Sequence, residues 1–244
     1  MALQRNSAAW TLKPDGLLMA NKLNILIKMK PALILFAVMF ISIPIHGTAV
    51  AEVFNVSNFS SDGLSGWGTK TFKGQTDYNL VKLNGTVAVK AHSKGTASGL
   101  IKRISLDPVR YRYLHWSWKV SGTLTKGDET RKDGDDYSAR LYVVFPGRFF
   151  WQTRAINYIW ANRLQVGQFI PNAYTGNTMM IAVESGTSKA GQWLSETRDI
   201  QADYKRVFGE SPNEIGAVAI MTDTDNTGGE AIAWYGDISI STDK

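Results

Sequence analysis

The sequence predicts an all-β protein, folded as an antiparallel two-sheet β-sandwich of jelly-roll type. Three observations indicate this fold. Short strand-like segments follow one another and are separated by Gly, Asn, Asp and Pro residues. Several segments alternate apolar and polar residues with a period of two. The helical pattern is confined to residues 203–208 and stops at Gly209. We therefore expect one sandwich domain over residues 52–244, preceded by a signal peptide over residues 1–51.

The leader has the three parts of a secretion signal. Basic residues (Lys22, Lys28 and Lys30) precede an apolar run over 31–45, which is followed by the small-residue end Ala49-Val50-Ala51. A membrane-spanning helix needs about 20 apolar residues, and this run is shorter. We expect cleavage after Ala51, no membrane span after cleavage, and a periplasmic or secreted protein.

Composition narrows the function classes. The chain has 27 basic and 21 acidic residues, but the leader holds five of the basic and one of the acidic ones, so residues 52–244 carry a net charge of +2. This balance, without basic runs interleaved with aromatic residues, argues against nucleic acid as a partner. The chain has no cysteine, so packing must stabilise the exported domain without disulfides.

The strands can be placed in order along the chain. Asn84-Gly85 separates two alternating runs and predicts a tight hairpin. Residues 161–177 are expected to form a long loop. The predicted strands cover 52–56, 78–83, 86–92, 98–106, 112–121, 136–145, 154–160, 178–184, 192–200, 214–222 and 231–241.

Alternation also assigns the faces of the strands. Trp116 and Trp118 share a face with aliphatic residues of 112–121, and Trp234 shares one with the isoleucines of 231–241. We expect all three tryptophans in the core, rather than exposed as sugar platforms. In 136–145, Asp136 and Arg140 take the face opposite the apolar one.

Polar residues on these outer faces are the first candidate site. Lys119, Asp136 and Arg140 are expected to line a solvated binding face beside Tyr142, with the guanidinium of Arg140 as a bidentate donor to a carboxylated sugar. The alternative is a face of solvated charges, in ion pairs that contribute at most about 1 kcal/mol each.

Aromatic and amide residues are concentrated between positions 157 and 177. Asn157 and Asn172 lie among Tyr and Trp residues there. Flat rings beside amides suit sugar recognition, because rings stack on pyranose faces and amides bond to hydroxyls. The alternative is a loop held to the sandwich by its aromatic residues.

Asp223 and Asp225 are the candidate metal ligands. Their alternate spacing before Gly228 resembles the start of a calcium loop, but Thr227 stands at the fifth position and Trp234 at the twelfth. An EF-hand is excluded, and the competing interpretation is a polar hairpin loop between the last two strands. No cofactor is required, and calcium is the one that the sequence suggests.

No catalytic signature is present in the sequence. Residues 95–99 do not fit G-x-S-x-G, and residues 52–244 contain only His92 and His115 as histidines. Acid–base chemistry by carboxylates or tyrosines, as in sugar-cleaving sandwiches, stays open.

Several phrases carry a family resemblance. They include Trp116-Ser117-Trp118, Gly134-Asp135-Asp136-Tyr137 and Thr222-Asp223-Thr224-Asp225-Asn226. Together they resemble the bacterial domain-of-unknown-function family 3047 over nearly the whole of residues 52–244. The resemblance implies an exported protein of Gram-negative bacteria with a jelly-roll-like fold, and it supplies no activity.

Three functions follow as hypotheses. The first is non-catalytic binding of a carbohydrate or another cell-envelope ligand. The alternative is a polysaccharide lyase or hydrolase that uses carboxylate, tyrosine or histidine chemistry on the same face. The third is a structural envelope protein, which predicts no groove.

Overall fold

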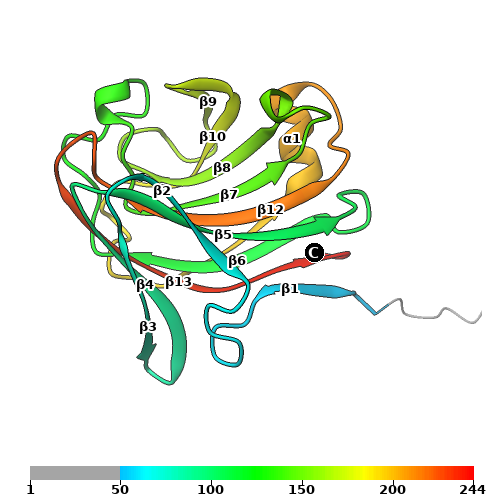
Figure 1. Ribbon diagram of the computed structural model, residues 1–244, viewed down its shortest axis with the longest axis horizontal. Coiled ribbons are helices and arrows are strands. Elements are labelled where there is room, and N and C mark those ends of the chain that lie inside the picture. Colours follow the sequence, from blue (N-terminus) through cyan, green and yellow to red (C-terminus); the bar gives the residue numbers. More distant parts are fainter. Residues whose placement is uncertain (1–49) are drawn as a thin grey trace, which may run out of the picture. The chain divides into compact units, whose positions relative to one another are not determined.

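The computed structural model describes residues 50–244. The predicted signal peptide lies almost wholly outside these residues, so its cleavage remains a prediction. The described part belongs to one compact unit, in which two layers of strands face each other (Figure 1). In residues 50–244, no helix is long and apolar enough to cross a membrane.

Thirteen strands and one α-helix are found in the described part of the chain. They are β1 (Val53–Ser57), β2 (Trp67–Lys73), β3 (Asp77–Leu83), β4 (Thr86–Lys94), β5 (Ala97–Leu106), β6 (Tyr113–Val120), β7 (Arg140–Phe145), β8 (Arg154–Ala161), β9 (Phe169–Asn172), β10 (Thr175–Ser185), β11 (Leu194–Asp199), α1 (Ile200–Phe208), β12 (Ile215–Asp223) and β13 (Glu230–Ser241).

The strands form two sheets, which confirms the predicted sandwich. One sheet has the order β11-β6-β13-β4-β3, with β1 also paired to β13, and the other has the order β2-β5-β12-β7-β8-β10-β9. All pairings are antiparallel except that of β8 with β10, which is parallel. Strand β9 lies between these two in the chain and pairs antiparallel with β10, so the chain reverses direction twice and β10 runs in the direction of β8. The main core lies between the sheets and includes Trp116, Trp118, Tyr158 and Trp160.

Two strands were absent from the sequence prediction. β2 is an edge strand that is largely exposed, so its sequence lacks an apolar face. β9 is only four residues long and contains Pro171. It lies inside residues 161–177, so the prediction of a long uninterrupted loop there was wrong. Proline is compatible with β9 because this strand is at the sheet edge.

The predicted hairpin at Asn84-Gly85 is present between β3 and β4. Both turn residues have positive φ, 50° at Asn84 and 89° at Gly85. A two-residue turn of this kind matches the twist of the flanking strands, and Asn followed by Gly tolerates it best. Leu83 and Thr86 are therefore register partners across the turn.

The tryptophan predictions divide at a bulge in β13. Trp116 and Trp118 are buried, as predicted. Trp234 is only half-buried, so its assignment to the core was wrong. The register of β13 against β6 shifts between Tyr235 and Ile238. A bulge adds a residue and reverses the alternation, so Tyr235 takes the inward position and the ring of Trp234 faces outward.

Helix α1 begins earlier than the predicted 203–208. The carboxylate of Asp199 accepts a hydrogen bond from the backbone N–H of Ala202 and caps the first turn. The helix ends at Gly209, whose φ of 78° is left-handed. Tyr204 packs its ring 4.5 Å from that of Phe145, which fastens the helix to β7.

Candidate functional site

A groove of about 540 Å³ lies on the outer face of the seven-stranded sheet. Its floor is made by β5, β12 and β7, whose registers align Gly99 with Met221 and Arg140, and Ile101 with Ala219 and Tyr142. Small side chains on these strands leave open space above the sheet. A Cβ at Gly99 would lie 2.9 Å from the carbonyl oxygen of Ile220, so this position admits only glycine without a shift of the backbone.

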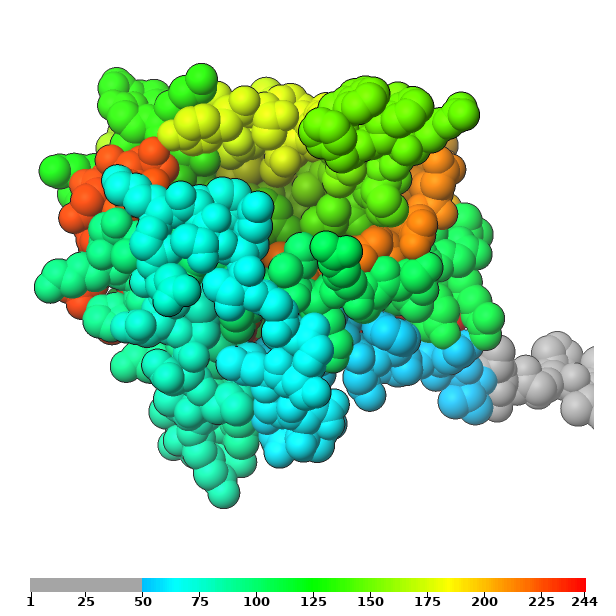
Figure 2. Space-filling view, in the orientation of Figure 1, coloured from blue at the N-terminus to red at the C-terminus, as the bar shows by residue number. Residues whose placement is uncertain are grey.

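Aromatic and amide side chains form the walls of the groove. Phe72 on β2 is 65% exposed and stands on one side, with Lys70 beside it. Asn172 on β9 and Tyr174 in the following turn are also lining residues. In Figure 2 the surface is recessed between the cyan β2 segment and the yellow-green segment near residue 150. This volume and largely apolar lining are typical of small-ligand sites.

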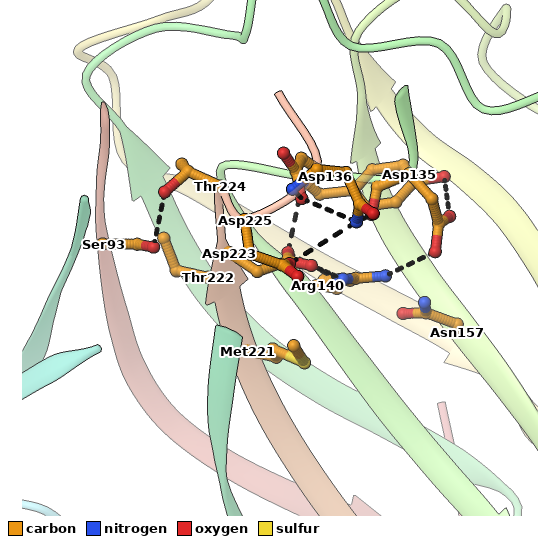
Figure 3. A network of polar contacts seen from close by, with 12 residues as sticks. Ser93, Asp135, Asp136, Arg140, Asn157, Met221, Thr222, Asp223, Thr224 and Asp225 are labelled. Atoms are coloured by element: carbon orange, nitrogen blue, oxygen red, sulfur yellow. Dashed lines mark hydrogen bonds and ion pairs between the residues drawn. The ribbon is translucent and has the colours of Figure 1, made fainter. Parts of the chain in front are cut away.

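One end of the groove holds a buried ion pair (Figure 3). Arg140 donates from Nε to Oδ1 of Asp223 over 2.9 Å, and its Nη2 pairs with Oδ2 of the same carboxylate. Its Nη1 lies 3.8 Å from Oδ2 of Asp135, and its guanidinium lies 4.5 Å from the ring centre of Tyr137. The side chains of Arg140 and Asp223 are 5% and 1% exposed. Arg140 is therefore not the solvated donor that the alternation predicted.

Asp136 is not part of the strand that carries Arg140, although its carboxylate lies beside the Arg140–Asp223 ion pair. Strand β7 begins at Arg140, so residues 136–139 are irregular and the expected alternation does not extend over them. Asp136 is fully buried and accepts hydrogen bonds from the backbone N–H groups of Asn226 and Thr227, at 3.2 and 2.6 Å. It pins the connection over 224–229. That connection runs from one sheet to the other, so the interpretation as a hairpin loop was wrong.

Lys119 lies on the other sheet. It belongs to β6, and its Nζ is 4.1 Å from the ring centre of Trp234 and 5.7 Å from that of Trp193. Its neighbours Trp118 and Val120 point into the core, so Lys119 faces away from the seven-stranded sheet. The structure thus separates Lys119 from Arg140, contrary to the single binding face expected from the sequence.

Tyr142 and the two asparagines lie at or under the groove. Tyr142 lines it, and burial raises the pKa of its hydroxyl, so the phenol is neutral. Asn157 is the register partner of Tyr142 but is fully buried, with Nδ2 3.2 Å from Sδ of Met180. Asn172 donates from Nδ2 to both oxygens of Asp135 at 3.0 Å, which orients that carboxylate at the groove.

Three carboxylates come close together beside the ion pair. One oxygen from each of Asp136, Asp223 and Asp225 lies within 4.8 Å of the others, so oxygen donors suited to a hard cation converge here. However, Arg140 already pairs with Asp223, and backbone N–H groups bind Asp136. Burial is the main cause of a raised pKa at Asp225, and the nearby carboxylate of Asp136 raises this pKa further. The guanidinium thus supplies positive charge where a metal ion would.

Several residues that line the groove were not among the predicted site residues. Phe72 lies in β2, a strand with little periodicity, and Gly99 was assigned only to the predicted strand over 98–106, without a role in a site. Asp135 is next to Asp136 in the sequence. The predicted strand began at residue 136, so Asp136 was chosen as the binding residue, whereas Asp135 lines the groove. Tyr174 was among the clustered aromatic residues, but nothing distinguished it from its neighbours.

Comparisons place the chain among known sequences and folds. The profile of a family described as "Protein of unknown function (DUF3047)" matches residues 65–239. Among curated proteins, no significant match to the sequence is found.

Solved structures with a similar fold include three at low sequence identity. A family 11 carbohydrate-binding module of a cellulosomal cellulase of Clostridium thermocellum is 8% identical, with a TM-score of 0.41 over 80% of this chain and 95% of that one. The xyloglucanase domain of NopAA from Sinorhizobium fredii is 11% identical, with a TM-score of 0.41 over 71% and 92%. An adhesin domain of Lys-gingipain from Porphyromonas gingivalis is 15% identical, with a TM-score of 0.36 over 78% and 99%. Likenesses this weak say nothing about what this chain binds.

Proposed function

The chain belongs to the DUF3047 family, and we propose that it is a non-catalytic carbohydrate-binding protein whose ligand lies in the groove of the seven-stranded sheet. The observation that carries the proposal is the combination of exposed aromatic walls, a floor of small residues and polar groups at one end. Sugar rings stack on flat apolar surfaces, while their hydroxyls need donors and acceptors nearby. Phe72 and Tyr174 provide the rings, and Asn172 and Asp135 provide the polar groups.

The charge of the groove favours an uncharged glycan. Its lining includes Asp135, Asp223 and Asp225 against Lys70 and Arg140. The guanidinium of Arg140 is already engaged by Asp223, so it has no free fork for a carboxylated sugar. This revises the role that the sequence gave to Arg140. From the leader alone, we place the ligand in the periplasm or outside the cell.

The test is calorimetric titration of the purified protein with soluble neutral and acidic polysaccharides. We expect binding to neutral glycans and at least tenfold weaker binding to polyuronates. Phe72→Ala should weaken binding at least tenfold, since stacking against an exposed ring is lost while the fold is kept. Ala219→Leu should also weaken it, because the longer side chain fills the floor of the groove.

The matched control is Trp193→Ala. Trp193 is 38% exposed and lies within cation–π distance of Lys119 on the other sheet, so its loss should leave binding unchanged. Binding that survives both groove variants, or a preference for polyuronates, would contradict the proposal.

An enzyme is the second candidate, and the raised pKa of Asp225 is the observation that favours it. A carboxyl whose pKa is raised by burial and by a neighbouring carboxylate can donate its proton as a general acid at a higher pH than an ordinary aspartic acid can. The readout is release of new reducing ends or unsaturated products from a bound polysaccharide during prolonged incubation. Product formation that Asp225→Asn abolishes would replace the binding proposal with a catalytic one.

A further inference from the structure

Three adjacent aromatic residues are exposed in the connection between β7 and β8. Phe149, Phe150 and Trp151 are 46%, 84% and 59% exposed, and we call them the aromatic patch. Phe149 and Trp151 stack at 4.8 Å with an interplanar angle of 6°, and Phe150 meets Trp151 edge-on at 5.1 Å. Contiguous exposed apolar surface of this kind usually marks a contact site.

The aromatic patch lies at the end of the groove away from the ion pair. Val144, the last lining residue of β7, leads into the connection that carries the patch. On β10, Thr178 lines the groove, and its neighbour Asn177 donates from Nδ2 to the carbonyl oxygen of Trp151 at 2.8 Å. From Arg140 to Val144 the floor runs for about 13 Å at the usual rise of a strand. The groove therefore leads from the buried ions towards the patch.

Backbone hydrogen bonds and close packing brace the connection that carries the aromatic patch. The N–H of Gln152 donates to the carbonyl oxygen of Phe149 at 3.0 Å, and the N–H of Thr153 donates to that of Phe150 at 3.2 Å. At Gly147 a Cβ would lie 2.5 Å from Cβ of Gln152, so the two ends of the loop pack directly together. A braced backbone reduces the entropy that this connection loses when a partner binds.

We propose that the aromatic patch is a distal subsite of the groove, which stacks against a sugar ring of a glycan chain that extends beyond Val144. This inference rests on the proposed function and deepens it. It means that the protein binds along a polysaccharide or a long oligosaccharide rather than a single sugar or chain end. Polar groups at the ion-pair end select hydroxyls, and the rings at the other end add affinity only for chains long enough to reach them.

A lipid surface is the competing occupant, because aromatic residues beside a cation can enter a membrane interface. Arg148 is the only charged residue in 146–153, and the nearest cation in sequence, Arg154, pairs with Glu210 at 2.5 Å. Stable attachment to a membrane takes more than one weak signal. The continuity with the groove favours the glycan chain.

The test measures affinity against oligosaccharide length for whichever neutral glycan binds the wild type. Affinity should rise with length until the chain reaches the patch and then level off. Trp151→Ala should lower affinity for long chains about tenfold and leave that for short chains unchanged, with an unaltered melting temperature. Trp151→Phe should keep most of the length dependence. The control Trp193→Ala, an exposed tryptophan associated with the other sheet, should change neither.

Each other outcome counts against the subsite. If Trp151→Ala lowered the affinity for short and long chains equally, Trp151 would have a structural role in the groove rather than a contact with a distal sugar. No loss, while Phe72→Ala still weakens binding, would overturn the subsite and leave the proposed function standing. Trp151→Ala could instead keep its glycan affinity and lose binding to anionic phospholipid vesicles, which would assign the patch to a membrane. If it kept its glycan affinity and lost self-association in sedimentation, the patch would be assigned to a second copy of the chain. Absence of binding to any glycan would overturn both proposals.

Discussion

Arg140 and Asp223 form a two-point ion pair that is almost fully excluded from solvent. Nε and Nη2 of the guanidinium meet the two carboxylate oxygens, and the side chains are 5% and 1% exposed. Arg140 comes from the first residue of β7, and Asp223 from the last residue of β12. The pair therefore fixes one end of the groove while stabilising the contact between two neighbouring strands.

The first prediction concerns this pair. Arg140→Met should destabilise the protein by about 3–5 kcal/mol, because it leaves the buried carboxylate of Asp223 without its partner. The double variant Arg140→Met with Asp223→Leu should recover a large part of the loss, since no buried charge is then unpaired. Urea denaturation of the three proteins measures the difference. A cost below about 1 kcal/mol for the single variant would show that the pair is solvated.

The second prediction compares two tryptophans that the sequence treated alike. Trp118→Ala should cost about 3–5 kcal/mol of unfolding free energy, because it opens a cavity between the sheets. Trp234→Ala should cost less than half as much, since its ring lies outside the core beyond the bulge. Equal costs in thermal or chemical denaturation would contradict the assignment of faces in β13.

Calcium is expected to have no effect on stability. A metal that binds only the folded state raises the melting temperature by mass action. In this cluster, Arg140 and backbone N–H groups already engage Asp223 and Asp136. Melting curves in millimolar calcium and in chelator should therefore coincide. If calcium raises the melting temperature and Asp225→Asn removes that rise, the metal binds at these carboxylates.

Ionisation of Asp225 should make the stability of the protein depend on pH. Burial raises its folded pKa above the ordinary value of 3.8, so between these two pKa values the folded state binds more protons than the unfolded state. The wild type therefore loses stability as pH rises through that window. Asp225→Asn should be more stable than the wild type at pH 7, by less than about 1 kcal/mol because solvent screens this partly exposed group.

Denaturation at pH 7 and below pH 3.8 measures this difference, which should vanish at the lower pH. A variant that is less stable than the wild type at pH 7 would show that the ionised carboxylate is stabilised, for example by Lys73, whose Nζ binds the carbonyl oxygen of Asp225 at 3.2 Å.

The last prediction is the start of the exported chain at Glu52. This residue is tied to the end of the domain, because its N–H donates to Oγ1 of Thr242 and its carboxylate pairs with Arg110. Cleavage after Ala51 would leave these contacts in place. Intact-mass measurement of protein from the native host should give a chain that begins at Glu52, and recovery of the 27.0 kDa chain would exclude cleavage.

Local features of the fold were readable from the sequence. Period-two alternation located β6 and placed Trp116 and Trp118 in the core. Asn84-Gly85 predicted the hairpin, and Gly209 predicted the end of the helix. These features depend on residues close together in the chain, whose backbone preferences and spacing are visible without the partner strands.

Only the tertiary structure decided which polar residues meet. Lys119 and Arg140 have the same local pattern, but their strands enter different sheets, and pairing between distant segments determines which sheet a strand joins. The bulge that turns Trp234 outward is defined by the partner strand β6. Arg140 is buried because Asp223, 83 residues later, is placed beside it. Burial and charge pairing are properties of neighbours in space, so the groove could be located only after the strands were assembled.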